Sequence, residues 1–235
     1  METSTGFELT FDREAYIELQ GERFRRLLAR PGVRAEFDEV FAEIQTIVQP
    51  RAAWDRFEIA AFEGQGARLK DGTRIGHGPF RRFMENAAEL VLLLCTVGPE
   101  VDAQIAAHQR RGDMLKGVLL DELATWAVGL VREEALHEIT SSIEARGLYS
   151  GVPLAPGQSG WSVAEQRTVF SLLDGGAIGV TLSGSYLMRP IKSTSTALGV
   201  GPEPVGPRVE GKVPCDFCSL EEHCRYSRSA GRTAA

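Results

Sequence analysis

Apolar residues recur every three or four positions in the first fifty residues and predict helices there. At residues 31–49 the spacing fits one face of an amphipathic helix that begins after a proline–glycine break. A weaker pattern of the same period precedes it and indicates another helix, with Arg23, Arg25 and Arg26 on its solvated surface. We therefore predict that residues 1–50 form an N-terminal helical segment.

The hydrophobic period changes after residue 54. The runs FEIAAF and GARLKDGTRI are typical of strands, and Asp71-Gly72 is a turn signal whose glycine accepts positive φ. The nearly all-apolar run at residues 88–98 predicts a strand that is buried on both faces. Helical patterns follow at residues 99–111 and 113–146. The middle of the chain therefore combines strands with long helices.

Shorter elements and loops follow the second of these helices. A loop rich in Gly and Pro at residues 149–161 precedes a predicted helix at 162–173, with Ser162 as N-cap and Glu165 completing a capping box. The segments AIGVTL and STALGVG indicate strands on either side of the polar stretch SGSYLMRPIKS. Residues 202–235 begin as a linker by composition and end in a short polar tail.

The composition is that of an ordinary globular chain. Of its 235 residues, 43% are hydrophobic and 25% are charged, which excludes disorder as the general state. The net charge of −6 argues against binding to a nucleic-acid backbone and favours a small molecule or a protein as partner. We find no signal-peptide pattern and no apolar run long enough to span a membrane, so we expect a cytoplasmic protein with reduced thiols.

Three of the four cysteines lie within the ten residues CDFCSLEEHC. The C-x2-C pair Cys215 and Cys218 can face one ion, and Cys224 can close the site after a short turn. Two fourth ligands remain open. His223 would complete a zinc site, whereas Cys95 would complete a set of four thiolates, favouring a 4Fe-4S cluster or a zinc site that ties the tail to the core. A buried cysteine such as Cys95 is most often a small hydrophobe.

A second candidate site combines two polar segments. In APGQSGW the glycines permit close approach of a ligand, and LSGSYLMRPIKSTS adds several hydroxyls, an aromatic ring and two cations. The same stretches could equally be ordinary loops with capping serines. The candidate ligand-binding residues are Ala155, Pro156, Gly157, Gln158, Ser185, Tyr186, Met188, Arg189, Lys192 and Ser193.

The block from Ala155 to Ser195 resembles the activation domain of cobalamin-dependent methionine synthase and its free-standing relatives. It is similar to that family's Pro-Gly loop, helix, strand and following Met-x-Pro turn, and the segments GDMLKGVLLDELAT, LLCTVGPEVD and CDFCSLEEHCRY add to the likeness. The resemblance implies an α+β fold in which helices flank a twisted antiparallel sheet. It implies an activation-domain-like core at residues 51–201, with the tail of residues 202–235 packing on it.

The resemblance also implies a function. The domain would bind S-adenosylmethionine in a groove and support reductive methylation of cob(II)alamin on a separate corrinoid protein, which supplies the cobalamin. The family's loop reads Arg-x-x-Pro-Gly-Tyr, but here Pro153 and Gln158 stand at the arginine and tyrosine positions. Arg189 or Lys192 would then meet the ligand's carboxylate. An acidic ligand residue of the family falls near Thr125.

Three hypotheses follow from these features. The first is the S-adenosylmethionine-binding reactivation component of a methyltransferase of the methionine synthase type. The second keeps the corrinoid partner but makes the protein an iron-sulfur electron-transfer adaptor with little or no S-adenosylmethionine binding. The third is a structural protein in which zinc clips the tail and the groove is empty.

Overall fold

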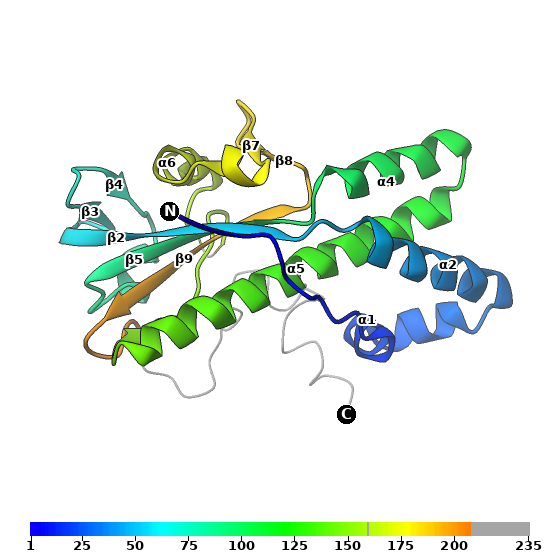
Figure 1. Ribbon diagram of the computed structural model, residues 1–235, viewed down its shortest axis with the longest axis horizontal. Helices are drawn as coiled ribbons and strands as arrows, with labels where there is room; N and C mark the ends of the chain where they lie inside the picture. Colours follow the sequence, from blue (N-terminus) through cyan, green and yellow to red (C-terminus); the bar gives the residue numbers. More distant parts are fainter. Residues whose placement is uncertain (159, 208–235) are drawn as a thin grey trace.

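The computed structural model describes residues 1–158 and 160–207, and its centre is an antiparallel sheet (Figure 1). The strand order is β4-β3-β2-β5-β9-β6, and β1 pairs with the first part of β2. The strands of this sheet are β1 (Glu2–Ser4), β2 (Arg51–Glu63), β3 (Gly66–Leu69), β4 (Arg74–Ile75), β5 (Glu89–Thr96), β6 (Tyr149–Ser150) and β9 (Ser193–Gly201). In its central register Cys95 of β5 lies opposite Ala52 of β2 and Thr194 of β9.

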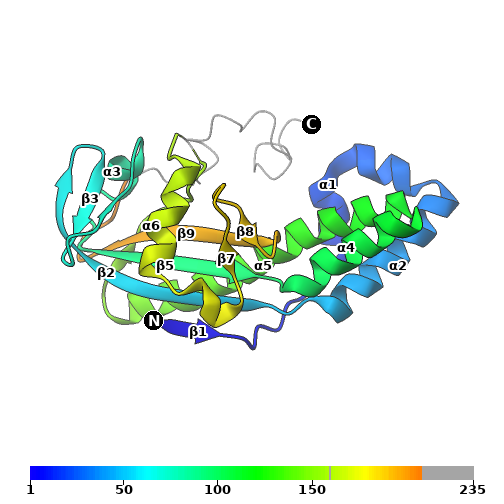
Figure 2. The same cartoon turned by 90° about the horizontal axis from the view of Figure 1, so that it is seen from above.

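Helices cover both faces of this sheet unequally. The helices are α1 (Arg13–Leu28), α2 (Pro31–Ile47), α3 (Phe80–Phe83), α4 (Pro99–Arg111), α5 (Met114–Ala145) and α6 (Gln166–Leu172), with 3-10 turns η1 (Val163–Glu165) and η2 (Gly175–Ile178). The long helix α5 runs along one face, whereas α6 and the hairpin of β7 (Thr181–Leu182) and β8 (Met188–Arg189) lie over the other (Figures 1 and 2). Helices α1, α2 and α4 gather around the far end of α5.

Alternation along the strands divides the interior into two cores. On β5, Leu93 and Cys95 pack into the core under α5, and Leu92 and Leu94 pack into the core on the α6 side. Successive side chains of a strand point to opposite faces, so an almost wholly apolar β5 is explained by burial on both sides. The prediction of a doubly buried strand at residues 88–98 is confirmed.

Most long elements agree with the sequence pattern, and the short ones depart from it. The predicted helices at 31–49, 99–111 and 113–146 are found as α2, α4 and α5, and Asp71-Gly72 turns β3 into β4. The segment AIGVTL was predicted as a strand, but its first two residues belong to the 3-10 turn η2, and only Thr181–Leu182 pairs as β7. Short apolar runs carry too little periodicity to separate a strand from a turn.

The helix predicted at residues 162–173 also differs in its first turn. Ser162 is the expected cap, because its Oγ accepts a hydrogen bond from the Ala164 N–H at 3.2 Å. The capping-box prediction for Glu165 is wrong, since its carboxylate accepts from the backbone of Gly76, 89 residues away. A tertiary contact has therefore replaced the local one.

The N-terminal residues form the strand β1 and the helices α1 and α2. Gly21, at φ 76° and ψ −175°, interrupts α1. The rings of Tyr16, Phe24 and Phe37 pack against one another between the two helices, with centroids 5.5 to 5.9 Å apart. Among the residues that the structure describes, no helix has both the length and the apolar character needed to cross a bilayer.

Candidate functional site

The predicted ligand loop is a tight turn at the edge of β9. Leu154 forms an isolated antiparallel bridge with Ala197, which holds the loop beside the strand. The Gln158 N–H then donates to the Ala155 carbonyl at 3.0 Å, and Gly157 adopts φ 96°. A Pro-Gly pair suits such a turn, because proline presets the first position and glycine accepts positive φ at the second. The Gln158 Oε1 also accepts from the Ala155 N–H at 3.0 Å, so a side chain locks the turn.

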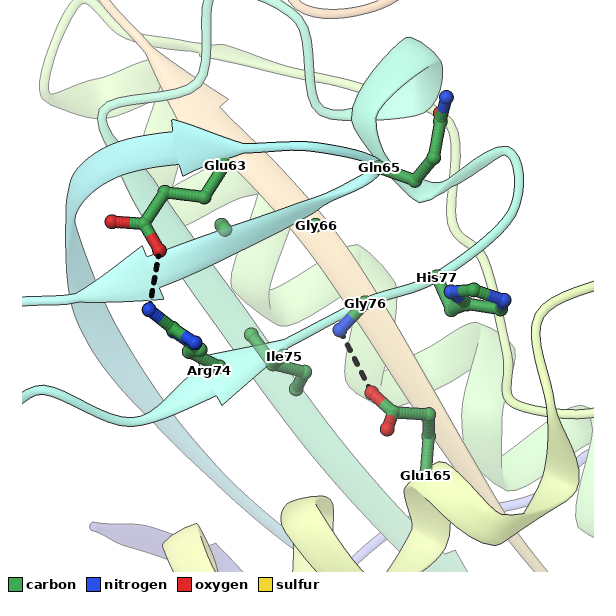
Figure 3. Close-up of a pocket in the computed structure, with 9 residues that line it drawn as sticks. Glu63, Gln65, Gly66, Arg74, Ile75, Gly76, His77 and Glu165 are labelled. Carbon is green, nitrogen blue, oxygen red and sulfur yellow. Dashed lines mark hydrogen bonds and ion pairs between the residues drawn. The ribbon is translucent and has the colours of Figure 1, made fainter.

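The residues after the turn anchor it to the rest of the sheet. Gly157 N–H donates to the Trp161 carbonyl at 2.7 Å, and the buried Trp161 ring packs edge-on against Phe80 with centroids 5.1 Å apart. Glu165 Oε2 accepts from the Gly76 N–H at 2.8 Å, as Figure 3 shows, and also from Trp161 Nε1 at 3.4 Å. The loop is therefore held by the buried ring of Trp161 and by the Glu165 carboxylate, which accepts hydrogen bonds from both Trp161 and Gly76.

A small polar cavity of about 210 Å³ lies next to this anchor. Glu63, Arg74, His77 and Glu165 are among the residues that line it, and Figure 3 shows Glu165 pointing toward Gly76, which directly follows β4. Its two carboxylates are already engaged, because Glu63 pairs with Arg68 and Arg74, and Glu165 with Gly76. Because these carboxylates already hold protein groups in place, we assign no ligand to the cavity.

The β7–β8 hairpin carries the second group of predicted residues. Ser183 organises its tip, accepting at Oγ from the Leu187 N–H at 3.0 Å and lying 3.1 Å from Ser185 Oγ. Tyr186 adopts φ 62°, a left-handed conformation that costs a bulky residue on the order of 1 kcal/mol. Arg167 of α6 donates to the Tyr186 hydroxyl at 2.7 Å and holds it in this position.

The first residues of β9 join the hairpin to the sheet. Ser193 Oγ donates to the Pro190 carbonyl at 2.8 Å and lies 3.0 Å from Thr96 Oγ1. Two residues later, Ser195 Oγ donates to Gln166 Oε1 of α6 at 3.0 Å. Helix α6 thus contacts β9 through Gln166 and the hairpin through Arg167, and it follows the Pro-Gly turn directly in the chain.

Lys192 is separated from the other predicted ligand residues. Its Nζ lies 2.9 Å from Asp121 Oδ1 and 2.9 Å from Thr125 Oγ1, so its side chain points toward α5, and only 9% of the residue is exposed. A lysine already paired with a carboxylate is poorly placed to compensate a second one. Arg189 is exposed, and its guanidinium makes no ion pair or hydrogen bond to any residue that the structure describes. Of the two cations proposed for the ligand's carboxylate, Arg189 is the available one.

The structure thus brings the turn at 155–158 and the hairpin residues to one side of the sheet, around α6 (Figure 2). Sequence reasoning did not single out Trp161, Gln166 or Asp121, although each fixes part of this region. The signal for Trp161 was present, since a large aromatic ring directly after a glycine-rich turn is a natural anchor. No local pattern could have paired Asp121 with a lysine 71 positions later.

Cys95 lies in an environment that suits a thiol rather than a thiolate. It is fully buried in the core under α5, and burial raises its pKa from 9.0 to about 12. Cys95 is enclosed by the apolar side chains of this core, which argues against a metal at this position, since ligation requires the thiolate. The predicted ligands Cys215, Cys218 and Cys224, and the alternative His223, lie outside the described residues. Within residues 1–158 and 160–207, no group of three His, Cys, Asp or Glu side chains could hold a metal ion.

The fold and the loop together define an α+β domain whose antiparallel sheet carries a long helix on one face and an anchored Pro-Gly turn at its edge. This fold is similar to a solved structure, the crystal structure of the MetH reactivation domain bound to AdoHcy. The match has a TM-score of 0.57 at 15% identity and covers 96% of this chain and 80% of that chain. At this identity the likeness shows the fold alone. No protein-family model matches the sequence, and no curated protein matches it.

Proposed function

We propose that this protein is a reactivation component for a cobalamin-dependent methyltransferase of the methionine synthase type, which binds S-adenosylmethionine for a separate corrinoid protein. The observation that carries the proposal is the locked Pro-Gly turn at the edge of β9, on the fold of a domain crystallised with AdoHcy. AdoHcy is S-adenosylmethionine without its transferable methyl group. The predicted fold and the likeness to the reactivation domain agree with this function.

The backbone of the turn offers groups that suit a cationic ligand. Its N–H groups at Ala155, Gly157 and Gln158 are all used within the loop. The carbonyl oxygens of Pro156 and Gly157 accept no hydrogen bond from any described residue. S-adenosylmethionine carries a sulfonium and an ammonium group, both of which are favoured next to carbonyl oxygens. We therefore assign these two carbonyls to the cationic end of the ligand.

The hairpin would supply the remaining contacts. Arg189 is free to pair with the ligand's carboxylate, and a charge-assisted hydrogen bond of this kind is about twice as strong as a neutral one. Ser185, Tyr186, Met188 and Ser193 would contact the rest of the ligand. Tyr186 is held in its uncommon conformation by Arg167, so its ring would be positioned before the ligand binds.

The role of this chain in the reaction is to bind and orient. The partner's corrinoid would supply the methyl acceptor, and the turn and hairpin would hold the sulfonium end of S-adenosylmethionine.

Calorimetric titration of the full chain with S-adenosylmethionine and with AdoHcy tests the proposal. We expect both to bind, and Arg189→Ala to weaken binding by about ten-fold, as loss of a charge-assisted hydrogen bond predicts. Arg25→Ala is the matched control, since Arg25 is an exposed arginine on α1, and it should bind like the unaltered protein. Absence of heat for both ligands at millimolar concentration, with and without a corrinoid protein, would overturn the proposal.

A further inference from the structure

A second cavity, of about 660 Å³, lies on α1. Gly21, whose φ and ψ are not helical, divides α1 into two parts, and a break at glycine changes the direction of a helix. Residues from both parts and from the following turn can therefore line one hollow. Phe24 and Leu27 are half-buried and give it an apolar floor. The residues that line it are called the α1 surface below: Gln20, Arg23, Phe24, Arg26, Leu27 and Arg30.

The α1 surface presents positive charge and a hydrogen-bond donor that the described part of the chain leaves unpaired. Arg26 pairs with Glu22 at 3.1 Å, but the exposed Arg23 and Arg30 form no ion pair with any described residue. The Nε2 of Gln20 is buried and has no hydrogen-bond partner among the described residues. Guanidinium and amide N–H groups donate to carboxylates, so the surface suits a partner that presents Asp or Glu.

The last turns of α5 carry the opposite charge. Their exposed carboxylates, none of which forms an ion pair within the described part of the chain, are those of Glu133, Glu134, Glu138 and Glu144. Glu134 and Glu138 are four residues apart on one face, a spacing at which like charges destabilise a helix. Ala135, Ile139 and Ile143 of the same turns are buried in the core under α5, so the carboxylates point away from that core. Cations from another molecule would relieve this repulsion.

We propose that the α1 surface of one copy of this chain binds the last turns of α5 in a second copy. Arg23 and Arg30 would pair with carboxylates of the second copy, and Gln20 Nε2 would gain an acceptor. Complementary charge of this kind selects a partner and its orientation. Because the chain has a net charge of −6, two copies repel each other overall, so an attractive contact needs opposite charges that face each other locally.

The position of the two surfaces allows the contact to be made twice. Figure 1 shows α1 and α5 on the side of the sheet opposite α6. In a dimer with two-fold symmetry, a contact from the first copy to the second is repeated from the second to the first. Each copy would therefore give its α1 surface to the other's α5. The turn at 155–158 and the β7–β8 hairpin lie over the opposite face, so failure of this inference would leave S-adenosylmethionine binding untouched.

Sedimentation velocity of the full chain over a range of concentrations tests the dimer. At low ionic strength we expect a monomer–dimer equilibrium whose dissociation constant rises with salt, because exposed ion pairs are screened. Arg23→Glu/Arg30→Glu reverses the cations and should raise the dissociation constant by about ten-fold or more, since the contact is made twice. Glu134→Arg/Glu138→Arg reverses the anions and should do the same. The matched control Arg25→Glu changes the same charge on the same helix outside the cavity and should associate like the unaltered protein.

A mixture of the two double variants tests whether the two surfaces meet. Each variant alone opposes like charges at both contacts of the dimer. In a mixed dimer, the reversed α1 surface of one variant meets the reversed α5 of the other, and the second contact is unaltered. We therefore expect an equimolar mixture to associate about as tightly as the unaltered protein.

Three outcomes would overturn the inference. Sedimentation as a monomer at millimolar concentration and low ionic strength would show that the copies do not associate. A dimer that either double variant leaves intact would be held by another surface. Dissociation of both variants without recovery in the mixture would show that the two surfaces do not meet. Should a double variant lose its far-ultraviolet circular dichroism, Arg23→Gln/Arg30→Gln and Glu134→Gln/Glu138→Gln test the same contact, and each should then weaken the dimer several-fold.

Discussion

The two faces of the sheet are built differently. Under α5, apolar side chains of β2, β5 and β9 meet α5 and the N-terminal helices in one large core. On the other face, shorter elements pack a second core, and polar contacts such as Trp161 to Glu165 and Ser195 to Gln166 fix their positions. Non-directional apolar burial stabilises the α5 face, whereas directional hydrogen bonds shape the face that carries the turn and hairpin.

This difference indicates which face of the sheet provides stability and which face is suited to ligand binding. A large apolar core tolerates little change in volume but specifies no ligand. The opposite face holds the strained Tyr186 and an exposed Arg189 that pairs with no residue in the described part of the chain, and packing alone explains neither. Stability and ligand binding should therefore respond separately to substitutions on the two faces.

The largest effect is expected from a truncation under α5. Leu123 of α5 is fully buried in this core, so Leu123→Ala should lower the free energy of unfolding by about 2 to 5 kcal/mol. Urea unfolding followed by circular dichroism measures the loss. Leu187→Ala on the hairpin, where the side chain is 58% exposed, should change it by less than about 0.5 kcal/mol. Equal losses in the two variants would show that the faces do not differ as described.

A smaller loss of stability is expected when Glu165, which anchors the loop, is replaced. Glu165→Ala takes away the acceptor of the Gly76 N–H and of Trp161 Nε1, which should cost about 1 to 3 kcal/mol. Glu165→Gln keeps a carbonyl oxygen in the same place and should cost less. The same urea experiment measures both variants. A Gln variant as unstable as the Ala variant would mean that the negative charge, rather than the acceptor geometry, holds the loop.

The buried thiol under α5 should give the stability a dependence on alkaline pH. Burial raises the pKa of Cys95 from 9.0 to about 12, so the unfolded thiol ionises first and stability falls as pH rises through this window. Between pH 8 and pH 10 the loss is about 1.4 kcal/mol. The measurement is the free energy of unfolding of the unaltered protein minus that of Cys95→Ala, determined at each pH. A difference that stays constant over this range would show that the thiol is not desolvated.

The smallest effect is expected on metal content. Because Cys95 lies in the core, Cys95→Ala should leave the metal content of anaerobically purified protein unchanged, whereas Cys215→Ser should lower it. Elemental analysis with an absorption spectrum measures both and distinguishes zinc from an iron-sulfur cluster. Loss of metal in Cys95→Ala would restore the hypothesis of four thiolates that include Cys95.

Long periodic segments could be predicted from the sequence, and short ones could not. Helices α2, α4 and α5 and the strand β5 follow from apolar spacing sustained over eight or more residues. The last two residues of the turn η2 were predicted as part of a strand, and Glu165 was predicted to cap its own helix. In both cases the local signal spans only a few residues, so a contact with a distant element decides the conformation.

The candidate site shows the same limit. The turn at 155–158 and the hairpin residues could be selected from their composition, and the structure places them around α6. The orientation of Lys192 could not be predicted, because one residue along a strand reverses the face to which a side chain points. Its pairing with Asp121 follows from that orientation and from the position of α5 beside the sheet.

By itself the sequence determined the long helices, the doubly buried strand and the residue types available for a ligand or a metal, since these depend on local spacing and side-chain chemistry. Only the tertiary structure decided that Cys95 is enclosed in the core, that Lys192 is paired and that Arg189 has no partner among the described residues. Burial and pairing arise between residues far apart in the chain. They set the charge and accessibility of each group, and neither is encoded by its neighbours in sequence.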